Sequence, residues 1–127
     1  MEHAVSAFAI SLNVPEPKAS ARFLTEHFNY KVQMSSDGFT SLRHPDGGSN
    51  IIFLRTGLQT FKPPEAAGSA GDGLLLVLVV MDLDGYHREL EARGVDVVTP
   101  PETEGWGERF AQYRDPNGLI VQLVQWV

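Results

Sequence analysis

The apolar positions of this chain alternate over short runs, and two longer stretches follow a helical period. Alternation with a period of two is typical of strands, because neighbouring side chains point to opposite faces of a sheet. The longest unbroken apolar run extends from Leu74 to Met81, which suits a buried strand and is too short to cross a bilayer. The pattern predicts strands at residues 8–14, 30–34, 39–43 and 51–55, and again at 74–80, 95–98, 109–114 and 119–126.

A helix is expected between the first and second strands of each half. Pro15 and Pro17 end the first strand and open the first helix, and Asn29 is a plausible left-handed stop. In the second half, Asp82 or Asp84 can cap the helix and Gly94 ends it. The expected apolar faces comprise Ala19, Phe23, Leu24 and Phe28 in the first helix, and Leu83, Tyr86, His87 and Leu90 in the second.

The two halves share a turn as well as an element order. Residues 43–47 read Arg-His-Pro-Asp-Gly and residues 114–118 read Arg-Asp-Pro-Asn-Gly, and an apolar strand follows each. Val14 and Val80 lie 66 residues apart, whereas Arg43 and Arg114 lie 71 apart, so the second half carries an insertion, which we assign to a loop at 99–107. Two unrelated hairpins with the same turn chemistry are the alternative, since Pro-Asp-Gly turns are common.

We therefore predict an α+β fold of two tandem β-α-β-β-β modules within a single domain, residues 1–127. Module one spans about residues 5–57 and module two about residues 74–127. Glycines, prolines and alanines between them indicate a linker or mobile loop at 58–73.

Composition excludes several classes of function but does not indicate one. The net charge is −6, so the chain has no general attraction for nucleic acid or anionic membranes, and we expect neither as a partner. Hydrophobic residues make up 43% and charged residues 20%, as in ordinary globular proteins. There is no cysteine, which excludes disulfides, thiolate nucleophiles and zinc–thiolate sites. The N-terminus lacks a signal-peptide pattern, so a cytoplasmic location is expected.

The order and spacing of several motifs resemble the vicinal oxygen chelate superfamily, which contains glyoxalases, bleomycin-resistance proteins and ring-cleaving dioxygenases. The motifs lie at residues 11–14, 39–47, 80–84, 106–110 and 114–118. The resemblance covers nearly the whole chain. It implies that the modules form a curled mixed sheet around a shared cavity, and that the protein is a homodimer, with modules paired within or between chains.

The resemblance also implies where a metal would bind, because the family's enzymes hold a divalent ion with histidine and glutamate side chains. In this chain the histidine positions fall on Ala9 and Leu75, and the glutamate positions on Phe53 and Gln122. Shifts of two residues, which keep the same strand face, bring in no histidine or carboxylate. The histidines of the chain, His3, His27, His44 and His87, fall outside these strands. We therefore expect no metal and no other cofactor.

Other catalytic patterns are weak, and the remaining signal is aromatic. The cluster of Glu102, Glu104 and Glu108 could supply a base, but a solvated acidic loop is the favoured explanation, since a base needs a positioned, perturbed carboxylate. No serine elbow or phosphate loop is present. The side chains expected to bind a ligand, by stacking and a few neutral polar contacts, are Trp106, Phe53, Phe110, Gln112, Gln122 and Phe39. For Phe53 and Phe110, a purely structural role in the core is the alternative.

These residues favour a metal-free protein that binds a small, aromatic or drug-like molecule, as bleomycin-type resistance proteins do. Two alternatives stay open. One is a glyoxalase-like lyase, isomerase or dioxygenase with a non-standard metal site, and the other is a structural or regulatory dimer module with a filled cavity.

Overall fold

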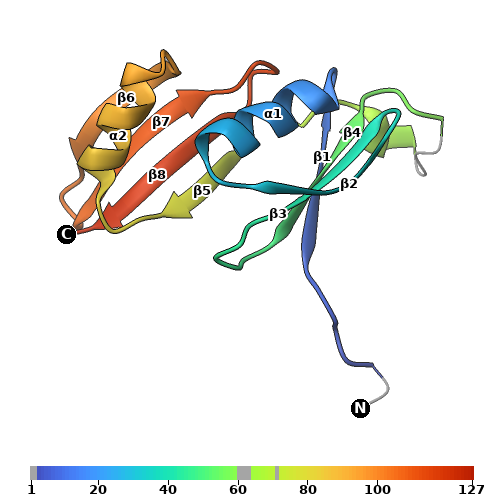
Figure 1. The fold of residues 1–127 in the computed structure, drawn as a ribbon, viewed down its shortest axis with the longest axis horizontal. Coiled ribbons are helices and arrows are strands. Elements are labelled where there is room, and N and C mark those ends of the chain that lie inside the picture. Colours follow the sequence, from blue (N-terminus) through green and yellow to red (C-terminus); the bar gives the residue numbers. More distant parts are fainter. Residues whose placement is uncertain (1–2, 60–63, 71) are drawn as a thin grey trace. The chain divides into compact units, whose positions relative to one another are not determined.

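The chain forms two compact units, Met1–Ala70 and Gly71–Val127, each built around its own sheet. The computed structural model describes residues 3–59, 64–70 and 72–127. Figure 1 shows that each unit contains a four-stranded sheet and one α-helix. In the part of the chain described, neither α-helix has the length and apolar character needed to cross a membrane.

The first unit has the order β-α-β-β-β. Its sheet runs β1-β4-β3-β2, with β1 parallel to β4 and the other pairs antiparallel. The helix connects β1 to β2 and packs mainly on β3 and β4. The elements are β1 Ala9–Val14, α1 Pro17–His27, β2 Lys31–Ser36, β3 Phe39–Arg43 and β4 Asn50–Arg55.

The second unit repeats this order and topology. Its sheet runs β5-β8-β7-β6, with β5 parallel to β8 and the other pairs antiparallel. The elements are β5 Leu75–Val79, α2 Leu83–Ala92, β6 Asp96–Thr103, β7 Glu108–Arg114 and β8 Ile120–Trp126. The α+β class and the two β-α-β-β-β modules are thus confirmed. Each module forms its own open sheet rather than a share of one sheet, and the cavity between modules stays a prediction.

The helix boundaries follow the local chemistry that the sequence indicates. Pro17 occupies the first turn of α1, where its missing N–H costs nothing. Asn29 adopts a left-handed conformation with φ of 63°, just beyond the end of α1. Asp82, rather than Asp84, caps α2 by accepting a 3.1 Å hydrogen bond from the backbone N–H of Gly85. Gly94, with φ of 77°, follows the end of α2 as predicted.

The prediction of a loop at 99–107 was wrong for its first half. Strand β6 continues to Thr103 and pairs with β7 as far as Thr103 and Arg109. Pro100 and Pro101 lie within this strand because β6 is at the edge of its sheet, where only one side of the strand is paired and proline is tolerated. The register shifts between Thr99 and Glu102 accommodate them.

The shared turn has the same hydrogen bonds in both units. In the first turn the N–H of Gly47 donates to the carbonyl of His44, and the N–H of Asp46 donates to His44 Nδ1, both at 3.1 Å. In the second turn the N–H of Gly118 donates to the carbonyl of Asp115 at 3.0 Å, and the N–H of Asn117 donates to Asp115 Oδ1 at 2.9 Å. An imidazole and a carboxylate therefore have the same role in the two turns.

The expected linker is partly folded onto the first unit. A short 3₁₀ helix, Pro64–Ala67, follows the first sheet, and the side-chain amide of Asn13 donates to the carbonyls of Ala66 and Gly68. The N–H of Ala70 donates to the carbonyl of Asn13 at 3.0 Å. Residues 64–70 thus belong to the first unit. Residues 60–63 and 71 of the predicted linker lie outside the described residues.

Candidate functional site

The sheet of the second unit has two chemically different faces. Three contacts with α2 define the helix face: the N–H of Leu83 donates to Gln125 Oε1, Arg109 pairs with Asp84, and His87 bonds Tyr113. Because side chains alternate along a strand, Gln112, Gln122 and their register partners point to the other face, which we call the helix-free face.

A ladder of three neutral polar side chains crosses the helix-free face. The hydroxyl of Thr99 on β6 donates to Gln112 Oε1 on β7 at 2.7 Å. Gln112 Nε2 in turn donates to Gln122 Oε1 on β8 at 2.8 Å. Thr99 pairs with Gln112 and Gln112 with Gln122 in the sheet register, so backbone pairing itself places the three side chains in line. We call these three residues the polar ladder.

Apolar side chains border the polar ladder on the same face. Val77 on β5 pairs with Gln122 and is exposed. Phe110 and Val124 pair with each other two residues further along β7 and β8. Trp126, 62% exposed, continues the same face to the end of β8. The polar ladder is therefore a narrow hydrogen-bonding strip with apolar side chains towards one end of the sheet and, towards the other end, the ion pair of Arg114 with Asp96. Gln122 is itself 8% exposed, so only the edge of its side chain is accessible.

Trp106 lies in the turn between β6 and β7 and is 71% exposed. The turn is held to the end of the chain by a 2.9 Å bond from the Val127 N–H to the Gly107 carbonyl. Glu108, next along β7, pairs with Trp126. The backbone thus brings both tryptophans to the same end of the sheet. Sequence reasoning missed Trp126, although the alternation through Gln122 and Val124 indicated its face.

The candidate residues of the second unit gather on one face and one end of its sheet: Phe110, Gln112 and Gln122 on the helix-free face, and Trp106 at the end. The two candidates of the first unit do not share a face. Phe39 pairs with Leu54 on the face away from α1. Phe53 pairs with Leu12 and Thr40 on the helix face, and at 0% exposure it is part of the core.

Sheet register corrects the alignment of the implied metal positions. Leu42 pairs with Ile51 and Tyr113 with Val121, so the first turn is one residue longer than the second. Strand β1 gives the same answer, because Ser11 pairs with Ile52 where Val77 pairs with Gln122. The counterpart of Gln122 is thus Ile52 and not Phe53, whose side chain points to the opposite face.

The corrected positions do not fit a metal ion. They hold Ala9, Ile52, Leu75 and Gln122, which offer one neutral amide oxygen between them, and that oxygen already accepts a bond from Gln112. Among the residues that the structure describes, no group of three or more histidine, aspartate or glutamate side chains is arranged to hold a metal. Divalent metal ions need several convergent donors, which this site does not provide.

Two of the histidines have structural partners. His87 Nδ1 and the Tyr113 hydroxyl form a 2.7 Å hydrogen bond between α2 and β7, and both residues are buried. Burial, followed by the nearby Glu91 carboxylate, raises the pKa of Tyr113 above its ordinary value. His44 Nε2 lies 2.9 Å from the Phe28 carbonyl and, because Nδ1 accepts from a backbone N–H, donates to it. Both histidines thus join elements of their own unit.

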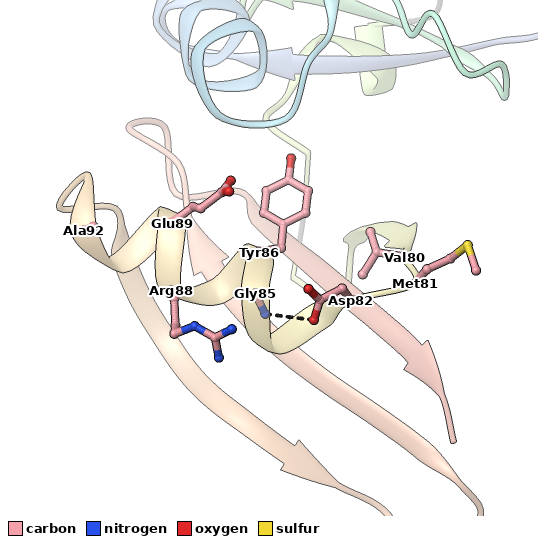
Figure 2. Close-up of a pocket in the computed structure, with 8 residues that line it drawn as sticks. All are labelled: Val80, Met81, Asp82, Gly85, Tyr86, Arg88, Glu89 and Ala92. Atoms are coloured by element: carbon pink, nitrogen blue, oxygen red, sulfur yellow. Dashed lines mark hydrogen bonds between the residues drawn. The ribbon is translucent and has the colours of Figure 1, made fainter.

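A surface hollow of about 680 Å³ lies along α2 and the residues just before it (Figure 2). It is lined by Val80, Met81, Asp82, Gly85, Tyr86, Arg88, Glu89 and Ala92. In Figure 2 the side chains of Tyr86 and Glu89 extend on one side of the helix and Arg88 on another. A second hollow, of about 380 Å³, lies between α1 and β2. Neither hollow includes a ligand-binding residue predicted from the sequence or a member of the polar ladder.

Fold and site together define an α+β protein of two β-α-β-β-β modules, with neutral side chains at the positions where the resemblance implied metal ligands. The chain belongs to the Glyoxalase/Bleomycin resistance protein/Dioxygenase superfamily, whose family model matches residues 3–123. No curated protein sequence matches it.

Solved structures of this superfamily have the same fold. A glyoxalase/bleomycin resistance protein/dioxygenase from Nocardioides is similar with a TM-score of 0.80 at 21% identity, over 98% of this chain and 85% of the other. TnmS3, an antibiotic binding protein from Streptomyces sp. CB03234, is similar with a TM-score of 0.74 at 20% identity, over 98% of each chain. TioX from Micromonospora sp. ML1 is similar with a TM-score of 0.71 at 21% identity, over 97% of this chain and 100% of the other. At these identities the likeness concerns the fold.

Proposed function

We propose that this protein binds a small, flat, largely apolar molecule on the helix-free face of its second sheet and acts by sequestering it, as an antibiotic-binding protein does. The polar ladder carries this proposal. A hydrogen-bonded strip of uncharged side chains bordered by apolar and aromatic groups suits a neutral ligand that stacks and makes one or two polar contacts. The name of TnmS3, an antibiotic binding protein with this fold, supports such a role.

The ligand-binding residues in this proposal are Phe110, Gln112 and Gln122, with Trp106 and Trp126 at the aromatic end. Phe110 lies on the same face as both glutamines, so a planar ring stacked there stays within reach of the polar ladder. Phe39 would serve a corresponding face of the first sheet. The protein is proposed to act as a homodimer without a metal or other cofactor.

A panel of uncharged planar aromatic compounds tests the proposal, with thermal shift and tryptophan emission as readouts. The single variants Trp106→Phe and Trp126→Phe each leave one tryptophan as the reporter. We expect a saturable thermal shift with quenching from both remaining reporters, because both lie at the proposed end of the site. A panel that produces neither signal overturns the proposal.

Elemental analysis of protein purified without chelators separates binding from catalysis. We expect less than stoichiometric metal. A stoichiometric divalent metal together with turnover of a chelating substrate would favour the glyoxalase-like alternative.

A further inference from the structure

We propose that the polar ladder is polarised, and that it selects ligands carrying a hydrogen-bond acceptor, such as a ring carbonyl, opposite Gln122. This inference rests on the proposed function and specifies the ligand chemistry of the same face. It predicts that the site rejects planar molecules of the same shape that present an N–H or O–H donor at that edge.

The direction of the polar ladder follows from its bonds. Thr99 donates its hydroxyl proton to Gln112 Oε1, which leaves the Gln112 amide nitrogen to donate to Gln122 Oε1. Both amide oxygens are thus used within the ladder, and the ladder ends at the N–H groups of Gln122 Nε2. Within the described part of the chain this nitrogen has no hydrogen-bond partner, and it is not fully shielded from solvent. Two donors therefore remain for a ligand.

The three side chains hold one another in this direction. Turning a single amide by half a rotation would bring two N–H groups or two oxygens face to face, which sacrifices a hydrogen bond. Reversing both amides together would keep the two internal bonds, but the half-buried Thr99 hydroxyl would then have to give its proton to a different acceptor. No other acceptor for that hydroxyl is found among the described residues. Thr99 therefore favours the arrangement in which Gln122 Nε2 faces the ligand, because the reversed ladder leaves its hydroxyl only solvent as an acceptor.

The surroundings indicate a neutral acceptor rather than an anion. None of the three ladder residues carries charge, and Val77, Phe110 and Val124 beside them are apolar. The nearest charged side chain along β7 on this face, Arg114, is already paired with Asp96 at 3.5 Å. A carboxylate brought to this position would lose hydration without gaining an unpaired counter-charge, because Arg114 is already bonded to Asp96, whereas a ketone or amide oxygen loses much less hydration. The favoured ligand is therefore an uncharged planar ring system with a carbonyl oxygen on one edge.

Three tricyclic compounds of nearly equal shape test this selection. 9-Fluorenone carries an acceptor, carbazole carries an N–H donor, and fluorene carries neither. We expect calorimetry to show 9-fluorenone binding about tenfold more tightly than carbazole, the worth of one hydrogen bond in an apolar site. Equal affinity for all three would overturn the polarity and leave the proposed binding function intact. If none of the three binds, while other planar compounds do, the polarity is overturned as well; if no planar compound binds, the proposed function itself fails.

Substitution of Gln122 gives a pH-dependent signature that a purely structural role would not produce. Gln122→Glu keeps an oxygen for Gln112 but replaces the outward N–H groups by a carboxylate oxygen. Its preference for 9-fluorenone should disappear at about pH 8 and return at about pH 4, where a protonated carboxyl again donates. The wild-type preference should stay constant over the same range, because threonine and glutamine do not titrate. A preference in Gln122→Glu that does not change with pH would contradict the assignment.

Thr99→Val provides a second, nearly isosteric test. It removes the proton that fixes the direction while preserving the β-branched side chain within β6. The ladder amides can then reverse together, so the expected result is a ratio of 9-fluorenone to carbazole affinity that falls towards one, with thermal stability changed little. Retention of the full wild-type ratio would show that Thr99 does not set the polarity.

Discussion

The Asp115 carboxylate should be one of the most sensitive positions in the second unit, although it lies in a turn. It is 5% exposed, and its Oδ1 accepts backbone N–H bonds from Asn117 at 2.9 Å and Leu119 at 2.8 Å. Replacement by alanine removes both bonds and leaves the N–H of buried Leu119 without its acceptor. Hydrogen bonds to charged groups contribute about 1.5–3 kcal/mol each, so taking the lower value for both gives a loss of about 3 kcal/mol.

Asparagine at the same position separates the geometry of these bonds from the charge. Asp115→Asn keeps an oxygen that can accept both N–H groups but makes each bond neutral, so we expect it to lose about half as much stability. Asp46→Ala is the matched control in the other turn, because that carboxylate is 86% exposed, and it should change stability by less than about 0.5 kcal/mol.

Urea unfolding followed by tryptophan emission measures these effects. Both tryptophans belong to the second unit, so the signal reports directly on the unit that contains Asp115. A lower midpoint with an unchanged denaturant slope is the expected form of the result. The reasoning is refuted if Asp115→Ala loses less than about 1 kcal/mol, or if the alanine and asparagine variants lose the same amount.

Three further predictions concern the core and the surface. Burial raises the pKa of Tyr113 in the folded state, so unfolded chains ionise first as the pH rises. The stability that the Tyr113 hydroxyl contributes should therefore be complete below pH 10 and decline above it. Tyr113→Phe should lose about 1 kcal/mol of unfolding free energy at pH 7, and its stability should approach that of the wild type in alkaline urea titrations. The hydrogen bonds from Arg109 lower the pKa of Asp84, so their contribution to folding stability is present above about pH 4 and disappears in acid. The stability of Asp84→Asn should therefore depend less on pH below about pH 4 than that of the wild type. Leu123→Ala removes a fully buried side chain of β8 and should lose about 2–5 kcal/mol in the same denaturant assay, whereas a loss below about 1 kcal/mol would contradict its place in the core.

Local chemistry in the sequence was sufficient to predict the element order and the turns. Asn29, Asp82 and Gly94 act where helix-end preferences place them, and both Pro-Asx-Gly turns close as expected. The glutamines of the candidate site could also be found, because alternation along β7 and β8 assigns Gln112 and Gln122 to the same face.

The misassigned positions have two physical causes. Consecutive prolines concealed the continuation of β6, so Thr99 was assigned to a loop and its part in the polar ladder was missed. Phe53 was also aligned with Gln122 because a leucine follows each, whereas the sheet register matches Gln122 with Ile52, one residue earlier. A shift of one residue turns a side chain to the opposite face, which is why Phe53 was assigned to a site while its side chain belongs to the core.

The two prolines of β6 also affect how this protein behaves in a crowded solution. An edge strand with regularly spaced N–H groups is a template on which strands of other molecules can assemble into aggregates. Pro100 and Pro101 lack the N–H group that an added strand needs, and the local shift in register disturbs the regularity of this edge. The β6 edge is thus protected against intermolecular pairing by residues that the candidate site does not use, and this protection persists when the ligand is absent.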